Sequence, residues 1–266
     1  MSTSKIEWTD ETWNSIVGCS HISPACDHCY AERMARRQVA MRNHPASILK
    51  DGRWSGQVAE RVTKPPSFTP KRVFVGSMTD LFHPMVRLAW LDRIWGLMEE
   101  RKLVTFQILT KRPDRMLEYV ENRAARGLTF DLPNLWVGAT VENQDQDWRI
   151  HFLLQTPAAV RFVSIEPMLG DVDLDLSFDG PASLRAIRRA DPSSNREGKA
   201  LLDWVICGGE TGPGARLMHT AWATSLRDQC AAAGVPFFFK KWGNASLNDG
   251  SGLAPEMPRQ FPEERP

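Results

Sequence analysis

The sequence predicts an α/β fold, a partial (β/α) barrel of six to seven parallel strands. Short runs of apolar, β-branched and aromatic residues alternate along the chain with segments whose apolar residues recur at helical spacing. This alternation is typical of βαβ units, which build parallel sheets. Six or seven such units are too many for a comfortable open sheet and too few for a closed barrel of eight strands, so a partial barrel is expected.

The first half of the predicted barrel contains three strands, each followed by a helix. The run TWNSIVG at 12–18 is the first strand, and the helix after it is expected at 29–41. RVFVGS at 72–77 precedes a helix at 88–100, in which the apolar residues fall at helical spacing. VTFQIL at 104–109 precedes a helix at 114–125.

The second half repeats the pattern and completes one domain over residues 1–243. Strands are expected at 135–139, 161–165, 204–207 and 236–240, with helices at 143–155 and 219–233. Polar insertions at 42–71 and 170–200 interrupt the alternation, and four prolines with little periodicity indicate an irregular C-terminal tail at 244–266.

The composition favours a cytoplasmic protein. The chain of 266 residues has a net charge of +1, so it has no overall basic field that would require a nucleic acid. No apolar run is long enough to cross a bilayer, and the polar N-terminal segment has no signal-peptide core. We therefore expect a protein that acts in the cytoplasm and does not contact a membrane.

Three of the five cysteines, Cys19, Cys26 and Cys29, form a C-x6-C-x2-C motif. In a chain without an export signal, such crowding indicates metal or redox chemistry rather than a disulfide framework. Thiolates are soft ligands that suit zinc or an iron–sulfur cluster. Three cysteines without a clear fourth ligand favour a cubane cluster with one open iron.

Zinc and metal-free thiols are the alternatives at this motif. A structural zinc ion normally takes four protein ligands, and the fourth would have to be His21, His28 or Cys207. Both histidines are close to the cysteines in sequence, whereas Cys207 ends the sixth strand and would have to reach across the fold.

Polar residues follow almost every predicted strand, at the ends where parallel barrels carry their chemistry. The candidates at this rim are Gly76, Ser77, Asp80, Lys111, Arg112, Glu142, Glu166, Gly208, Gly209, Glu210, Lys240 and Lys241. Any single member is explained equally well as a helix cap or as a turn residue. The whole set is the signature of a pocket.

The cysteine motif carries a resemblance to known families. Three cysteines after the first strand of a partial barrel, with an aromatic residue (His28) before the last, resemble the radical S-adenosylmethionine superfamily. Its common spacing is C-x3-C-x2-C, so the first gap is longer here. Over most of its length the chain is also similar to uncharacterised phage-associated three-cysteine-motif proteins, through segments such as GCSHISPACDHCYAERMA at 18–35, VFVGSMTDLFH at 73–83 and VICGGETGPGAR at 205–216.

The resemblance implies a function and its partners. In that superfamily three thiolates hold a [4Fe–4S] cluster, and S-adenosylmethionine bound to the open iron is cleaved to a 5′-deoxyadenosyl radical that abstracts hydrogen from a substrate. Cys19, Cys26 and Cys29 would be the metal ligands. An electron-donor protein would be required, and a protein encoded nearby is a possible further partner.

The resemblance also implies roles at the rim. Lys111 or Arg112 would bind the carboxylate of the methionine moiety, and Glu210 or Glu142 its ammonium group. Backbone at Gly76–Ser77 and at Gly208–Gly209 would lie close to the cofactor. The candidate catalytic residues are Glu142, Glu166 and Asp80.

A basic segment next to the cysteine motif bears on the substrate. Residues 31–72 contain ten Lys and Arg against three acids, with Trp54 and Phe68 among them. Such a segment can bind a phosphate backbone while its aromatic rings stack on bases, or it is a solvated surface. We therefore expect a radical S-adenosylmethionine-type enzyme, with nucleic acid or a nucleotide as the favoured substrate. The alternative is a non-catalytic nucleic-acid-binding protein stabilised by a cluster or by zinc.

Overall fold

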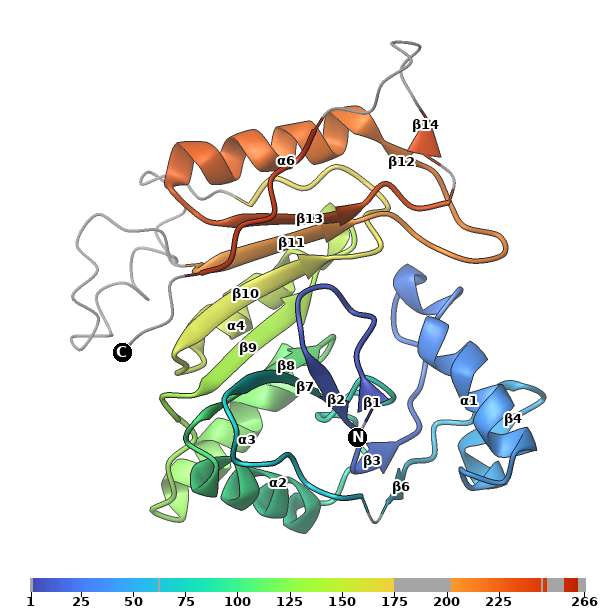
Figure 1. The fold of residues 1–266 in the computed structure, drawn as a ribbon, viewed down its shortest axis with the longest axis vertical. Helices are drawn as coiled ribbons and strands as arrows, with labels where there is room; N and C mark the ends of the chain where they lie inside the picture. The colour runs from blue at the N-terminus through green and yellow to red at the C-terminus, as the bar shows by residue number, and fades with distance from the viewer. Residues whose placement is uncertain (1, 62, 175–201, 245, 248–255, 263–266) are drawn as a thin grey trace.

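The central element of the fold is one curled sheet. The computed structural model describes residues 2–61, 63–174, 202–244, 246–247 and 256–262. Within them the sheet has the order β1 (Ser2–Thr3), β2 (Glu11–Trp13), β7 (Lys71–Val75), β8 (Val104–Thr110), β9 (Leu135–Thr140), β10 (Val160–Ile165), β11 (Trp204–Gly208) and β13 (Phe237–Lys241). The seven strands from β2 to β13 are parallel, and β1 alone is antiparallel. They form a half-barrel (Figure 1), which confirms the predicted partial barrel.

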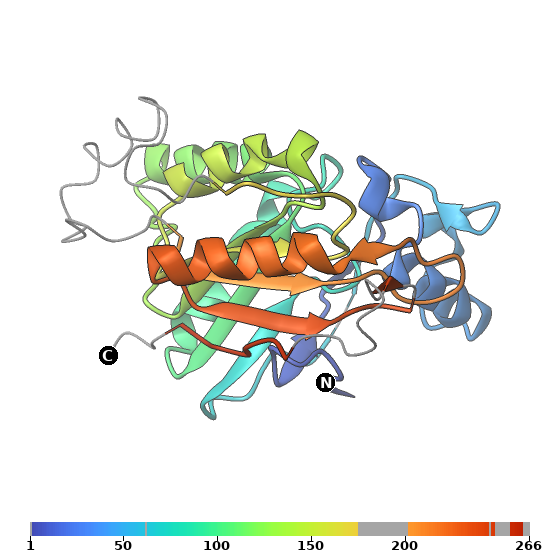
Figure 2. The ribbon, with the colours of Figure 1, turned by 90° about the horizontal axis from the view of Figure 1, so that it is seen from above.

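The helices lie in two places. The outer face of the sheet is covered by α2 (Leu88–Glu100), α3 (Pro113–Ala125), α4 (Trp148–Gln155) and α6 (Thr220–Ala233), as Figures 1 and 2 show. In contrast, α1 (Tyr30–Ala40) lies beyond the carboxyl ends of the strands. The helix expected at 143–155 begins only at Trp148, after the 3-10 turn η3 (Gln144–Gln146). No helix in the described part of the chain is both long and apolar enough to span a bilayer.

Alternate strand residues separate two apolar layers. In β9, Leu135 and Val137 pack outward against the helices, whereas Trp136 points inward, as the two-residue period of a strand requires. The inner layer is aromatic: the Trp204 ring packs against those of Trp136 and Phe162, at centroid distances of 5.9 and 5.6 Å. Rings at the start of the strands therefore fill the lower part of the half-barrel.

The insertion at 42–71 is folded around α1. The strands β4 (Leu49–Lys50) and β5 (Arg53–Trp54) form a hairpin, and β6 (Ala59–Glu60) pairs with β3 (Ile16–Val17). Asp51 and Gly52 close the hairpin with φ values of 52° and 75°, the positive values that a two-residue type I′ turn requires. Residues 30–61, which comprise α1, η2 (Ala46–Ile48), β4, β5 and β6, are called the α1 lobe below.

The second insertion and the tail are described only in part. The predicted insertion at 170–200 falls mainly on 175–201, outside the described residues. Of the tail, β14 (Ser246–Leu247) pairs with β12 (Met218–His219). The backbone of 256–262 runs along the edge strand β13, because Phe239 N donates to Pro258 O at 2.9 Å and Gln260 N donates to Phe237 O at 2.9 Å. This segment satisfies part of an otherwise open sheet edge.

Candidate functional site

A pocket of about 350 Å³ opens at the carboxyl ends of the parallel strands. Its walls bring together residues from β7, β8, β9, β10 and β13, from the loop after β11, and from the cysteine loop. The predicted residues among them are Cys19, Cys26, Cys29, Gly76, Ser77, Asp80, Lys111, Arg112, Glu166, Gly209, Glu210, Lys240 and Lys241. Only Glu142 and Gly208 of the candidate site residues are missing from this lining.

All three cysteines of the motif reach the pocket, and none forms a disulfide. Cys26 ends the 3-10 helix η1 (Pro24–Cys26), and Cys29 directly precedes α1. Cys29 N donates to Cys26 O at 3.3 Å, which fixes the spacing of these two residues. Among the described residues, no three His, Cys, Asp or Glu side chains are gathered as the ligands of a metal ion. The thiols therefore share a pocket without surrounding one point.

Gly18 sets the path of the chain into the cysteine loop. Its φ of +103° is in the left-handed region, and a Cβ at this position would lie 2.2 Å from the carbonyl oxygen of Gln57. The Thr79 hydroxyl donates to Gly18 O at 2.6 Å, and Gly56 N donates to Cys19 O at 3.1 Å. Glycine is therefore required where the loop passes between β7 and the α1 lobe.

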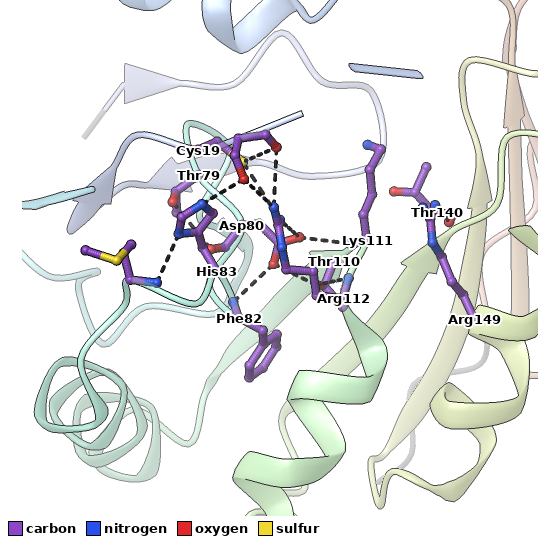
Figure 3. A network of polar contacts seen from close by, with 12 residues as sticks. Cys19, Thr79, Asp80, Phe82, His83, Thr110, Lys111, Arg112, Thr140 and Arg149 are labelled. Carbon is purple, nitrogen blue, oxygen red and sulfur yellow. Dashed lines mark hydrogen bonds and ion pairs between the residues drawn. The ribbon is translucent and has the colours of Figure 1, made fainter. Parts of the chain in front are cut away.

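Arg112 joins the cysteine loop to the ends of β7 and β8 (Figure 3). Its Nη1 donates to Asp80 Oδ2 at 3.0 Å and lies 4.0 Å from Cys19 Sγ. Its Nη2 donates to Ser20 Oγ at 2.9 Å. Burial, together with the charge of Asp80, raises the pKa of Cys19 to about 11, and the guanidinium of Arg112 opposes that rise. Arg112 is thus the cation that stabilises negative charge on this sulfur.

Asp80 is the anchor of this network. Its Oδ1 accepts hydrogen bonds from Phe82 N at 3.0 Å and from the Thr110 hydroxyl at 2.7 Å. Its Oδ2 accepts from Lys111 N at 3.0 Å as well as from Arg112. Four donors occupy a buried carboxylate, so the acceptor capacity of Asp80 is committed. The structure gives this candidate catalytic residue a positioning role.

His83 belongs to the same hydrogen-bond network through Ser20 of the cysteine loop. Met85 N donates to His83 Nδ1 at 3.2 Å, so the ring proton is on Nε2, which donates to Ser20 Oγ at 2.9 Å. The side chain is buried, and that burial together with the nearby Arg112 lowers the pKa of His83 to about 4. Asp80 raises it, and Arg115 lowers it further.

A pH dependence of stability follows from the lowered pKa of His83. The unfolded chain binds a proton on this imidazole below about pH 6.5, whereas the folded protein does so only near pH 4. The contribution of His83 to the free energy of unfolding is therefore present at pH 7 and decreases by about 2 kcal/mol at pH 5. We expect His83→Gln, which does not titrate, to lose less stability than the wild type between these pH values in urea unfolding. Equal losses in both proteins would contradict the assignment.

Glu210 ties the loop after β11 to the cysteine loop. Burial disfavours its ionised form, but hydrogen bonds from Arg216 and His28 outweigh burial and lower the pKa of Glu210 to about 2. Arg216 Nε donates to Glu210 Oε2 at 3.0 Å, and its Nη2 donates to Pro24 O at 2.8 Å. Figure 1 shows this loop projecting beyond the carboxyl end of β11. Through Glu210 and Arg216, the loop after β11 is therefore attached to the cysteine loop at Pro24.

The opposite wall of the pocket carries a further ion pair, and two lysines of the lining, Lys111 and Lys241, have no ion pair among the described residues. Lys240 Nζ lies 2.7 Å from Glu166 Oε1, and both side chains are partly open to the pocket. The ammonium group of Lys111 has no hydrogen bond or ion pair with any described residue. The hydroxyl-bearing side chains of Thr140 and Ser164 line the wall between these groups. This side therefore offers both charges and neutral hydrogen-bonding groups to a ligand.

Two of the predicted residues lie outside the pocket, and a third has a different role. Glu142 is fully buried, and Arg149 on α4 donates to its Oε2 at 2.8 Å. A Cβ on Gly208 would lie 3.4 Å from the Glu166 side chain, beneath the pocket wall. A Cβ on Gly209 would lie 2.1 Å from the Trp242 carbonyl oxygen. The close approach that Gly209 permits is therefore to the backbone after β13.

Comparison with known protein families gives one match. A family described as "Protein of unknown function (DUF5131)" matches residues 3–257. The chain belongs to this family. No curated protein and no solved structure matches it. The function of this DUF5131 member must therefore be argued from the site itself.

In this DUF5131 member, several functional positions had weak sequence signals. Ser164 lies two residues after the inward-facing Phe162, and Thr140 lies four residues after the inward-facing Trp136, so the two-residue period of a strand directs both side chains to the pocket side. Glu32 had no such signal: it is buried in α1, where it accepts hydrogen bonds from His21 at 2.9 Å and from Trp54 N at 2.8 Å. It fastens both the cysteine loop and the hairpin of the α1 lobe.

Proposed function

We propose that this protein is an iron–sulfur enzyme of the radical S-adenosylmethionine type, with its half-barrel serving the same purpose as the barrel of that superfamily. One observation carries the proposal: Cys19, Cys26 and Cys29 all line one pocket at the carboxyl ends of seven parallel strands. Three soft thiol ligands at the rim of such a sheet suit a [4Fe–4S] cluster with one iron open to a small molecule. When bound, the cluster would supply the electron that cleaves S-adenosylmethionine to a 5′-deoxyadenosyl radical.

The surroundings of the thiols support a cluster over a four-ligand zinc ion. Cys207 faces the outer core, where its Sγ lies 3.7 Å from Met168 Sδ. His21 is absent from the pocket lining. His28 lines the pocket, but it donates from Nδ1 to Glu210, and its Nε2 edge packs against Gly214. A zinc ion would need one of these three residues as its fourth ligand, and each of them makes its contacts elsewhere.

The charged residues around the thiols have distinct tasks in this proposal. Arg112, held by Asp80, would stabilise the negative charge of ligating thiolates. Lys111, whose ammonium group is unpaired within the described part of the chain, would bind the carboxylate of the methionine moiety. Glu166 would bind its ammonium group, because Lys240 is the one partner that Glu166 has among the described residues. The sequence also offered Glu210 and Glu142 for the ammonium group, but Glu210 is bound by Arg216 and Glu142 is bound by Arg149.

The proposal predicts the metal content of the protein. Anaerobic purification followed by chemical analysis is expected to give about four irons and four sulfides per chain. An electron paramagnetic resonance signal of the reduced protein should change when S-adenosylmethionine is added. Cys26→Ala is expected to lose the iron, the sulfide and this signal, because a three-thiol site has no spare ligand.

The matched control is Cys230→Ala, which removes a buried thiol in α6 far from the pocket lining. It should keep the wild-type iron content. Stoichiometric zinc without sulfide in the wild type would overturn the proposal and leave a zinc-stabilised binding protein. If the protein holds a cluster but its electron paramagnetic resonance signal does not change when S-adenosylmethionine is added, the radical chemistry is overturned and a redox or binding role is left.

A further inference from the structure

The α1 lobe carries a concentration of unpaired positive charge. Of the ten basic residues between 31 and 72, three are paired with carboxylates: Arg36 with Glu32, Lys71 with Glu11, and Arg72 with Asp10. The other seven have no carboxylate partner among the described residues. Six of them lie in the α1 lobe (Arg33, Arg37, Arg42, Lys50, Arg53 and Arg61), and the seventh, Lys64, follows it. The three acids offer little compensation: Glu32 is buried, Glu60 binds Arg93 outside the lobe, and only Asp51, in the turn between Lys50 and Arg53, is left exposed.

The hairpin of this lobe places two of these cations side by side. Lys50 and Arg53 are direct partners across β4 and β5, and both are exposed. Like charges in opposite positions of an antiparallel pair destabilise it. The turn between them lies against α1, where Gly52 is 3.8 Å from the Arg36 side chain when measured from an ideal Cβ. The lobe thus retains a repulsive pair that an anionic ligand would relieve.

One face of α1 links this charge to the pocket. Tyr30, Arg33 and Arg37 are three and four residues apart, so they lie on the same side of the helix. Tyr30 and Arg33 line the pocket itself. Tyr30 is 46% exposed, and its hydroxyl donates to Ser77 O at 2.8 Å, which fixes the ring at the mouth. Trp54 of the hairpin also lines the pocket.

The size of the pocket indicates where a large substrate would bind. A volume of about 350 Å³ is at the lower end of the range for a single small-molecule ligand. In the function proposed above, that space belongs to the cofactor. A second reactant must therefore lie across the mouth, where its neighbours are the ring of Tyr30 and the cations of the α1 lobe.

We propose that the α1 lobe binds single-stranded nucleic acid, with Arg37, Lys50 and Arg53 contacting phosphates and one base stacking on Tyr30 at the pocket mouth. A groove of cations that follows a phosphate backbone, combined with a fixed aromatic ring, is the recurring arrangement of single-strand binding surfaces. An exposed base at the mouth faces the pocket directly, whereas a base within a duplex does not. The inference that the bound strand is the substrate rests on the proposed function, whereas the inference that the lobe binds it does not.

The test measures fluorescence anisotropy of a labelled 20-nucleotide single-stranded DNA with the full chain. We expect affinity to fall with salt, with a log–log slope of about −3 for about four phosphate contacts. Arg37→Glu should weaken binding about tenfold and reduce that slope by about one. Tyr30→Ala should weaken binding about tenfold through loss of stacking, whereas Tyr30→Phe, which keeps the ring and loses only the hydrogen bond to Ser77 O, should recover most of that loss.

Lys102→Glu is the matched control for charge, because it makes the same change at an exposed site on the α2–β8 turn, at the opposite end of the sheet. It should bind like the wild type. Equal losses in Lys102→Glu and Arg37→Glu, or equal binding of polyglutamate, would overturn the proposal in favour of non-specific attraction or an acidic protein partner. Cys26→Ala should still bind the DNA, so failure of the metal site and failure of this surface give different results.

Discussion

Arg112→Ala is expected to lower the free energy of unfolding by about 3–5 kcal/mol, because it leaves the buried carboxylate of Asp80 without its counter-charge. Both side chains of this pair are only 8% exposed, so solvent screens the charge of Asp80 only weakly. The variant also loses the hydrogen bonds from Arg112 to Ser20 Oγ and Ser20 O. The cysteine loop should therefore loosen at Cys19 as well. Urea unfolding measures the first effect, and the rate of thiol alkylation measures the second.

Arg115→Ala is the matched control, since it removes an arginine three residues away whose partner Glu118 is exposed. An exposed pair of this kind contributes about 1 kcal/mol or less. The double variant Asp80→Asn/Arg112→Ala should recover part of the loss, because it removes the uncompensated charge together with its partner. If Arg112→Ala were no less stable than Arg115→Ala, the buried pair would not hold the ends of β7 and β8 together.

Most parallel strands and their helices were predictable because each has a local signal, but the strand expected at 12–18 is divided: Glu11–Trp13 joins the main sheet and Ile16–Val17 pairs with β6. The strand VTFQILT at β8 and the amphipathic helix α2 show their periods directly in the sequence, and sequential βαβ units leave few topologies. The early part of the predicted helix at 143–155 failed for a local reason, because the polar segment before Trp148 has no apolar face to bury and forms a 3-10 turn.

The set of pocket residues was also predictable, but their individual roles were not. Position after a parallel strand identifies Asp80, Glu142 and Glu210 as candidates. Their partners are set by tertiary contacts with residues on other elements: Arg112 after β8, Arg149 on α4 and Arg216 in the loop after β11. A sequence pattern shows that a carboxylate reaches the rim, and only the structure shows whether its oxygens are already occupied.

The basic segment illustrates the same difference at the surface. Counting charges in residues 31–72 treats Lys71 and Arg37 alike, yet Lys71 is paired with Glu11 whereas Arg37 is exposed and unpaired within the described residues. Of the two aromatic residues in that segment, Trp54 lines the pocket, but Phe68 stacks on Arg101, at 4.7 Å from ring centroid to guanidinium carbon. The sequence indicated a basic segment, and the structure shows that its unpaired cations are concentrated in the α1 lobe.

Gly209→Ala should destabilise the protein by about 3 kcal/mol or more, because its new methyl group meets backbone that has no room to move. A Cβ on Gly209 would lie 2.1 Å from the carbonyl oxygen of Trp242 and 2.9 Å from the nitrogen of Gly243. Relief would require β11 and the chain after β13 to separate, and Gly209 N would then lose its hydrogen bond to Lys241 O at 2.8 Å. Thermal unfolding of the purified variant measures this loss.

Gly208→Ala is the matched control. It makes the same substitution at the neighbouring residue, and so separates the steric clash at Gly209 from the general effect of replacing glycine by alanine. A Cβ on Gly208 would have its nearest neighbours at 3.4 Å, in the side chains of Glu166 and Lys240, which is an ordinary contact. We expect the free energy of unfolding of this variant to fall by less than about 1 kcal/mol. Alanine also lowers the conformational entropy of the unfolded chain, which offsets part of this fall. A Gly209→Ala protein as stable as Gly208→Ala would mean that β11 and β13 diverge at the pocket, and that the wall carrying Glu166 and Lys240 is not held as described. A large difference between the two variants would instead show that close backbone contact beneath this wall holds the strand end that carries Lys240.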